Sequence, residues 1–331
     1  MTTPDPETRP LLEVTDLVKH YGGTSGGLFS QPVPPVRAVD GVSLTLARGE
    51  TLGVVGESGC GKSSLARTLL RLEEPTSGAA RFDGEDIFAM SDRRFRMQRR
   101  ELQMIFQNPY ASLDPRMTVA SLIAEPMQIF PDHVAPARRR DRISELLTQV
   151  GLPPEAADRY PHEFSGGQRQ RIGIARALAL EPALIVCDEP VSALDVSVQA
   201  QVVNLLQDIQ DRTGVAYIFI AHDLSVVRHL SHRVAVMYLG KIVEQGPVDA
   251  VFDRPTHPYT RALMSAVPTG RKGGVRILLE NDMPDPRNPP SGCRFRTRCW
   301  KAQPLCAQEP PVFETRGRHG LESACYFPEN V

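Results

Sequence analysis

A short apolar run that leads into a glycine-rich loop constrains this sequence more than any other feature. Residues 52–55 read LGVV, residues 56–64 read GESGCGKSS, and residues 65–72 continue with the apolar spacing of a helix. This is a P-loop, GxxxxGKS, in the strand-loop-helix context in which the motif binds phosphate. Its glycines let successive backbone N–H groups turn toward phosphate oxygens, and the amino terminus of a helix favours the same anion. The sequence therefore predicts a nucleotide-binding α/β domain.

Most of the loop is expected to contact the nucleotide. Lys62 would reach the β- and γ-phosphates, Ser63 would be a ligand of Mg²⁺, and Cys60 would contribute its backbone. The predicted ATP-binding residues of the loop are Gly56, Ser58, Gly59, Cys60, Gly61, Lys62, Ser63 and Ser64.

A second apolar strand ends in two acidic residues. Residues 183–187 read ALIVC, and Asp188 and Glu189 follow directly. A carboxylate at a strand tip can hold Mg²⁺ through water, and its neighbour can orient and deprotonate an attacking water. We therefore expect Asp188 to serve Mg²⁺ and Glu189 to be the general base. Two acids after a strand can also cap a helix, but the preceding P-loop favours catalysis.

Further motifs carry a family resemblance. Residues 164–170 read FSGGQRQ and resemble the LSGGQ signature of ABC-type ATPases, with Phe in place of the first Leu. Gln107 follows the strand-like residues 104–106, SALD occupies residues 192–195, and His222 follows the strand-like residues 217–221. The order of P-loop, Gln107, signature, acidic strand, SALD and His222 is similar to that of the ABC ATPases throughout.

The resemblance implies a role for each of these residues. Tyr21 would stack on adenine, Gln107 would sense Mg²⁺ and the attacking water, and His222 would contact the γ-phosphate and help to position Glu189. The signature of one subunit would face the P-loop of another, so that a dimer would enclose two ATP molecules. The residues implied at that dimer interface are Ser165, Gly166, Gly167 and Gln168 of the signature and Asp195 of the D-loop.

Longer matches narrow the resemblance to the ATPases of oligopeptide and dipeptide permeases, and within them to the second of two ATPase subunits. These matches are GESGCGK at 56–62, LQMIFQNPYASLDPR at 102–116, SALDVSVQAQV at 192–202 and HPYT at 257–260. The resemblance implies an ATP-hydrolysing subunit of a peptide importer, peripheral at the cytoplasmic face of the inner membrane. Nickel, glutathione and sugar importers share the motifs and stay open as alternatives. A soluble ABC ATPase of DNA repair or translation is a remoter one.

The partners follow from the same resemblance. They are a second, related ATPase subunit, two transmembrane permease subunits and an extracytoplasmic substrate-binding protein. Residues 108–127 would contact the transmembrane partner. The net charge of −1 argues against a dedicated nucleic-acid binder. No apolar run approaches the ~20 residues that cross a bilayer, and acids and prolines stand at residues 1–10 in place of a signal peptide, so we do not expect export.

The chain divides near residue 250. Strand-like and helix-like runs alternate before it, whereas 11 of the 29 prolines lie from Pro255 onward. We expect residues 11–250 to form an ABC nucleotide-binding domain with a P-loop NTPase (RecA-like) α/β core and an antiparallel β edge. A helical subdomain would be inserted at about residues 108–165. Residues 251–331 would form a carboxy-terminal extension.

Four of the six cysteines lie in that extension, at Cys293, Cys299, Cys306 and Cys325. Zinc sites favour cysteine pairs two to four residues apart, which are missing here, whereas a cubane cluster accepts ligands from separated loop positions. Several peptide-type ATPases carry a similar set that resembles a [4Fe–4S] site. We expect such a cluster, with zinc as the alternative and four unliganded thiols as the simplest one.

Overall fold

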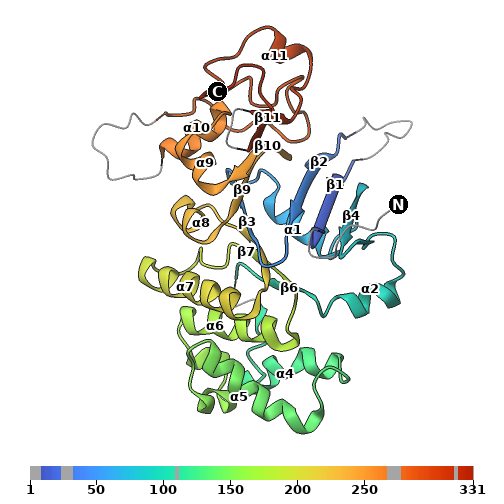
Figure 1. The fold of residues 1–331 in the computed structure, drawn as a ribbon, viewed down its shortest axis with the longest axis vertical. Coiled ribbons are helices and arrows are strands. Elements are labelled where there is room, and N and C mark those ends of the chain that lie inside the picture. The colour runs from blue at the N-terminus through green and yellow to red at the C-terminus, as the bar shows by residue number, and fades with distance from the viewer. Residues whose placement is uncertain (1–8, 24–32, 109–111, 267–276, 317–319, 331) are drawn as a thin grey trace. The chain divides into compact units, whose positions relative to one another are not determined.

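The computed structural model describes residues 9–23, 33–108, 112–266, 277–316 and 320–330. Figure 1 shows the helices and strands coloured in chain order. The chain divides into two compact units. The first takes in Met1–Ala47, Thr51–Ala89 and His222–Val331, and the second takes in Arg48–Glu50 and Met90–Ala221.

The first unit contains an antiparallel sheet near its amino terminus. Its strands, in the order β2-β1-β4-β5, are β2 (Val36–Leu46), β1 (Leu12–Tyr21), β4 (Ser77–Phe82) and β5 (Glu85–Asp86). Leu17, Val42 and Leu46 are fully buried. The alternation of buried and exposed residues along β2 is that of a sheet with one covered face. This sheet is the antiparallel β edge that the sequence predicts.

A second group of strands in the same unit carries the P-loop. β3 (Thr51–Val55) pairs in parallel with β9 (Arg233–Tyr238), and β9 pairs in antiparallel with β10 (Lys241–Pro247). β12 (Leu321–Ser323) follows β10, and β11 (Glu314–Arg316) pairs with β12. All five residues of β3 are buried, as expected for a strand covered on both faces.

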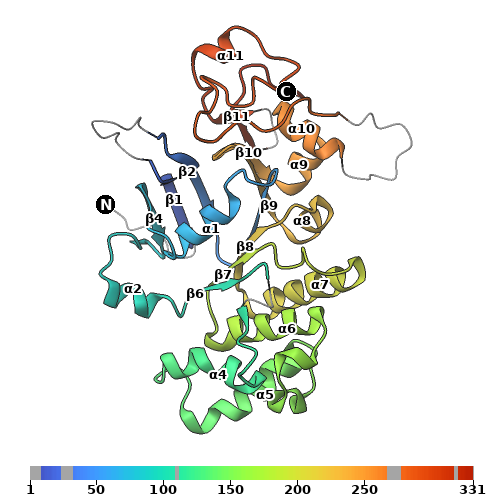
Figure 2. The ribbon, with the colours of Figure 1, turned by 180° about the vertical axis from the view of Figure 1, so that it is seen from behind.

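Short helices surround these strands. They are α1 (Lys62–Leu69), α8 (Leu224–Leu230), α9 (Val248–Asp253), α10 (Pro258–Ser265) and α11 (Leu305–Gln308). Figure 2 shows α1 beside β1 and β2, against which it packs. The proline-rich residues 283–290 form neither helix nor strand, because proline lacks the backbone donor that both require.

The second unit has a parallel group of strands in the order β8-β7-β6. These strands are β6 (Leu102–Ile105), β7 (Leu184–Asp188) and β8 (Ala216–Ile220). Every residue of β7 and β8 is buried. Both strands end at the same edge, which is where the sequence places its acidic pair.

Helices make up most of the rest of this unit. The α-helices are α2 (Asp92–Gln98), α4 (Val119–Ile129), α5 (Arg139–Gln149), α6 (Gly166–Ala177) and α7 (Val196–Thr213). Short 3-10 helices lie at Pro136–Arg138, Pro154–Asp158, Pro161–Glu163 and Leu178–Leu180. Helices α4, α5 and α6 pack together (Figure 1). Among the described residues between 112 and 165 there is no strand.

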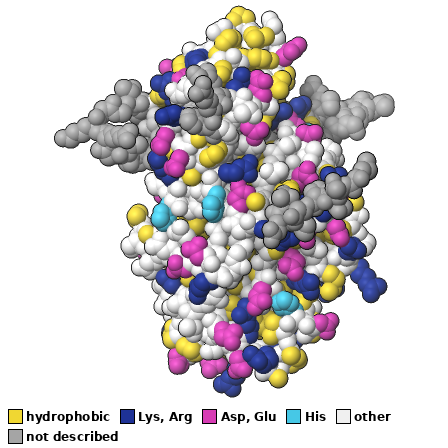
Figure 3. Space-filling view, viewed as in Figure 1, with side chains coloured by type: hydrophobic (Ala, Val, Ile, Leu, Met, Phe, Trp, Pro, Cys, Tyr) yellow, Lys and Arg dark blue, Asp and Glu magenta, His cyan; other side chains and the backbone are white. Residues whose placement is uncertain are grey.

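No helix in the part of the chain that the structure describes is long and apolar enough to cross a membrane. Figure 3 shows basic and acidic side chains intermingled over the face in view.

Candidate nucleotide-binding site

Glycines give the P-loop its shape. Gly56, Gly59 and Gly61 have positive φ angles of 154°, 80° and 112°, which side-chain-bearing residues rarely adopt. A Cβ at Gly56 would overlap the carbonyl oxygen of Met237, and one at Gly61 would overlap that of Ala38. Both conformation and space therefore require glycine at these two positions.

Lys62 lies inside the loop that precedes it. Its Nζ donates to the carbonyl oxygen of Gly56 at 2.8 Å and to that of Glu57 at 3.0 Å, and the residue is 5% exposed. Cys60 is buried beside it, with Sγ 3.7 Å from Nζ. Burial raises the pKa of the Cys60 thiol, so the thiol beside Lys62 is neutral.

Tyr21 lies at the end of β1. Its hydroxyl donates to the carboxylate of Glu73 and also interacts with Ser64 of α1, while Lys19 Nζ lies 4.7 Å from the centre of its ring. The structure therefore brings the predicted adenine-stacking residue to a residue of the P-loop helix.

Glu189 directly follows β7. It has a positive φ of 49°, and its backbone N–H donates to Ile220 of β8 at 2.9 Å. A non-glycine residue in this conformation costs about 1 kcal/mol, and such strain clusters at functional sites. Gln107 Nε2 donates to Glu189 Oε2 at 2.7 Å, so these two predicted residues are in contact. Asp188, the last residue of β7, is buried at 3% exposure.

The signature and the D-loop begin two neighbouring helices. Ser165 caps α6: its Oγ accepts from Gln168 N at 3.3 Å, and Gln168 Oε1 accepts from Ser165 N at 3.0 Å. Gly166 lies where a Cβ would be 3.5 Å from Leu194, and a Cβ at Gly167 would overlap Val198 of α7. These glycines allow the start of α6 to approach α7 closely.

Asp195 caps α7 in turn. Its carboxylate accepts from Val198 N at 2.9 Å and from the Ser197 hydroxyl at 2.7 Å, and the hydrogen bond from Ser197 lowers the pKa of Asp195. An ionised carboxylate is favourable at the amino terminus of a helix.

The predicted residues are divided between the two units. The first unit holds Tyr21, the P-loop and His222, and the second holds Gln107, the signature, the acidic pair and Asp195. His222 lies between β8 and Asp223, whose carboxylate caps α8 by accepting from Ser225 N at 2.8 Å.

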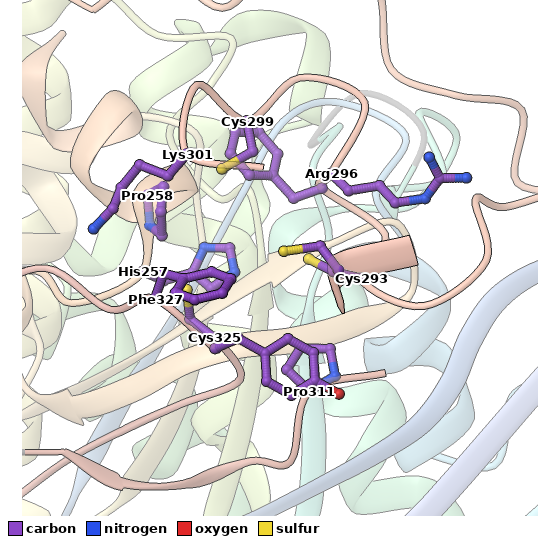
Figure 4. Close-up of a pocket in the computed structure, with 12 residues that line it drawn as sticks. His257, Pro258, Cys293, Arg296, Cys299, Lys301, Pro311, Cys325 and Phe327 are labelled. Atoms are coloured by element: carbon purple, nitrogen blue, oxygen red, sulfur yellow. The ribbon is translucent and has the colours of Figure 1, made fainter. Parts of the chain in front are cut away.

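The four carboxy-terminal cysteines line one pocket, together with His257 and Phe295. Figure 4 shows Cys293, Cys299 and Cys325 around it. Burial raises the pKa of both Cys293 and Cys325 to about 11. Among the described residues, no group of three or more His, Cys, Asp or Glu side chains is placed to hold a metal ion. The structure therefore gathers the predicted cysteines but does not confirm the cluster.

Two contacts of the P-loop have no signal in the sequence. The Arg298 guanidinium donates to Glu57 Oε2 at 2.8 Å, and the Glu57 N–H donates to the Tyr259 hydroxyl at 2.9 Å. Their partners lie more than 200 residues further along the chain.

Similarity to known proteins shows the family to which this chain belongs. A family model described as "ABC transporter" matches residues 39–192, and one described as "Oligopeptide/dipeptide transporter, C-terminal region" matches residues 243–306. The chain is 53% identical over 319 residues to the oligopeptide transport ATP-binding protein AppF of Bacillus subtilis, covering 95% of this chain and 96% of AppF. This chain belongs to the ATP-binding proteins of the ABC transporters. It is also 54% identical over 320 residues to OppF of Salmonella typhimurium, with coverage of 95% and 96%.

A solved structure agrees on the fold of this ABC protein. The dimeric ATP-binding cassette MJ0796 bound to ADP and Pi superposes with a TM-score of 0.63 at 26% identity, covering 72% of this chain and 98% of that one. The resemblance and the ABC ATPase fold expected from the sequence are confirmed.

Proposed function

We propose that this protein is the ATP-hydrolysing subunit of an ABC importer for peptides. One observation carries the proposal: a single chain joins an ABC cassette to a region typical of oligopeptide and dipeptide transporters, and its relatives at 53% and 54% identity are oligopeptide transport proteins. ATP binding and hydrolysis by this subunit would drive uptake through separate membrane subunits.

The proposed reaction is ATP and water to ADP and phosphate. The P-loop amides and Lys62 would bind the phosphates, and Ser63, Asp188 and Gln107 would hold Mg²⁺ through the oxygen ligands that it prefers. Mg²⁺, when bound, neutralises charge on the phosphate oxygens. Glu189 accepts a proton from water as the water oxygen bonds to the γ-phosphorus and the bond to the ADP oxygen breaks. The contact of Gln107 with Glu189 at 2.7 Å supports a shared role in orienting that water.

A closed dimer would complete the site. We place the signature residues 165–168 and Asp195 against ATP bound to the P-loop of a second, related ATPase subunit. His222 would contact the γ-phosphate beside Glu189, and Tyr21 would stack on adenine. The further partners are two transmembrane permeases and an extracytoplasmic substrate-binding protein, with this subunit peripheral at the cytoplasmic face of the inner membrane.

Within the chain, residues 11–250 would be the nucleotide-binding domain, with its helical subdomain at about 108–165, and residues 251–331 would be the extension. Residues 108–127 would dock on the permease; of these, residues 109–111 lie outside the described residues. The pairing of Arg176 with Glu125 at 2.6 Å and with Ser112 O at 2.9 Å supports a fixed arrangement of this segment on α6.

The four cysteines are proposed to hold a [4Fe–4S] cluster. Four cysteines that line one pocket would supply the four thiolate ligands that a [4Fe–4S] cluster takes. At a pKa of about 11, Cys293 and Cys325 would remain protonated at neutral pH without a cation, so loading would release protons. Anaerobically purified protein should be brown and contain iron and acid-labile sulfide. Colourless protein with one equivalent of zinc would establish the alternative.

Uptake by the reconstituted importer tests the transport proposal. Proteoliposomes containing both ATPases, both permeases and the binding protein are supplied with ATP and offered labelled oligopeptide, dipeptide, glutathione or nickel. ATP-dependent peptide accumulation is the expected result. Uptake of nickel or glutathione without peptide would select those alternatives, and ATP hydrolysis that no permease affects would favour a soluble ATPase.

A further inference from the structure

Every polar group of Glu57, the second residue of the P-loop, has a partner. Its carboxylate accepts from Arg298, its N–H donates to the Tyr259 hydroxyl, and its carbonyl oxygen accepts from Lys62 Nζ at 3.0 Å. Two of these partners come from the carboxy-terminal part of the chain, and the third is the lysine that would bind phosphate. Glu57 thus links the carboxy-terminal region to the place where the Lys62 ammonium is held.

Arg298 is held firmly enough to fix its partner. Its side chain is 6% exposed, whereas that of Glu57 is 28% exposed. The guanidinium lies 5.9 Å from the centre of the Tyr238 ring and 3.4 Å from the Tyr238 hydroxyl. A charge-assisted bond from a buried guanidinium is roughly twice as strong as a neutral one and restricts direction. Arg298 therefore constrains where the Glu57 carboxylate can lie.

Tyr259 is constrained in the same way. It is fully buried in the first turn of α10, and its ring packs on Tyr238 and Phe295 at centroid distances of 4.6 and 5.4 Å. His257 Nδ1, at the amino terminus of this helix, accepts from the Tyr259 N–H at 3.1 Å. Neither its ring nor its backbone can shift without breaking these contacts, so its hydroxyl is a fixed acceptor for the Glu57 N–H.

We propose that Arg298 and Tyr259 are positioning residues for the phosphate loop, acting through Glu57. The proposal rests on the proposed ATP binding at this loop. By fixing the Glu57 backbone, they fix one of the two carbonyl oxygens that hold Lys62, together with the start of the turn that presents the loop amides.

A graded effect is expected. The match with MJ0796 covers 98% of that cassette with 72% of this chain, so a cassette is complete with a much shorter chain. Loss of one contact should therefore loosen the loop and weaken nucleotide binding without abolishing it.

Equilibrium binding of a fluorescent ATP analogue to the full-length chain, with Mg²⁺, tests the proposal. Arg298→Gln and Glu57→Gln should each raise Kd about tenfold, and the double variant should be no worse than either, because one interaction is removed in all three. Arg298→Lys should recover part of the loss. Tyr259→Phe keeps the ring but removes the acceptor and should raise Kd a few-fold.

Arg261→Gln is the matched control. Arg261, also in α10, pairs with Glu329 rather than with the P-loop, and it should leave Kd unchanged. Thermal unfolding without nucleotide checks that each variant folds; if Arg298→Gln does not fold, Glu57→Gln tests the same pair from the loop side. Wild-type affinity in Arg298→Gln or Glu57→Gln, or additive losses in the double variant, would overturn the proposal. Failure of the wild-type chain to bind would instead overturn the proposed function.

Discussion

The phosphate loop and the acidic end of β7 reach their geometry in different ways. Around Glu189, strands β6, β7 and β8 pair in parallel, Ile220 accepts the Glu189 N–H, and Gln107 contacts the carboxylate. Every one of these contacts is made by residues of the three strands or by residues that closely follow them. The conformation of the P-loop depends partly on its own glycines. Glu57 in that loop is also held by the side chains of Tyr259 and Arg298, which lie more than 200 residues further along the chain.

The two regions would have different tasks. The acidic end would carry out chemistry, and its residues are fixed by the strands on which they lie. The phosphate loop would bind, and its fixed shape depends on a region that matches the peptide-transporter model at residues 243–306. Substitutions at the acidic end of β7 should therefore lower ATP turnover, whereas substitutions of Tyr259 or Arg298 should lower the affinity for ATP.

The largest effect is expected at Glu189. Glu189→Gln keeps the shape of the side chain but removes the base, so ATP turnover should fall by about 10²- to 10⁴-fold while ATP binding persists. Turnover and nucleotide binding of the reconstituted complex provide the measurement. Glu181→Gln, an exposed carboxylate of the same unit that pairs with Arg142, is the control and should turn over normally. Undiminished turnover in Glu189→Gln would remove Glu189 from the role of base.

A smaller but still large effect is expected at Gly61. Gly61→Ala adds a Cβ that overlaps Ala38 O at a φ of 112°, which costs about 1–3 kcal/mol and would deform the loop. Nucleotide affinity should fall about 10- to 100-fold, measured by titration of the full-length chain. Gly173→Ala, where a Cβ would meet nothing within 4 Å, is the control. Equal affinities in the two variants would contradict the geometry of the loop.

The next largest effect is expected at Glu244, which holds the residues that precede Tyr259. Glu244 is fully buried and accepts from Thr256 N at 2.6 Å, from the Thr256 hydroxyl at 2.7 Å and from His257 N at 3.1 Å. Glu244→Ala would remove the acceptor of the buried N–H groups of Thr256 and His257 and lower the free energy of unfolding by about 3 kcal/mol. Chemical denaturation measures this loss.

The smallest effect is expected on the nucleotide affinity of the same variant, Glu244→Ala. Because Glu244 holds the residues that precede Tyr259, Glu244→Ala should also raise the Kd for ATP a few-fold under conditions in which the chain stays folded. A stability loss with unchanged affinity would show that the support of α10 does not extend to the phosphate loop.

The sequence predicts the regions of this protein unevenly, for physical reasons. The P-loop, β7 and the signature are recognisable because their spacing along the chain is itself the structural requirement. The fold and family expected from them are confirmed, while the individual residue roles stay predictions. The cysteines could be grouped by composition, and the structure places all four at one pocket.

The contact of Arg298 with Glu57 could not be predicted in this way. The two residues are 241 positions apart, and no periodicity connects them. HPYT at 257–260 indicates a family resemblance, but nothing in its pattern predicts that Tyr259 contacts the phosphate loop. Such contacts depend on how the extension packs on β9 and β10, which a single sequence does not specify.

A steady-state ATP titration of the reconstituted importer, carrying either Glu189→Gln or Arg298→Gln, tests the central contrast most directly. For Glu189→Gln, we predict loss of kcat with ATP still bound. For Arg298→Gln, we predict a KM raised about tenfold with kcat within about twofold of wild type. A fall in kcat at unchanged KM for Arg298→Gln would contradict the account.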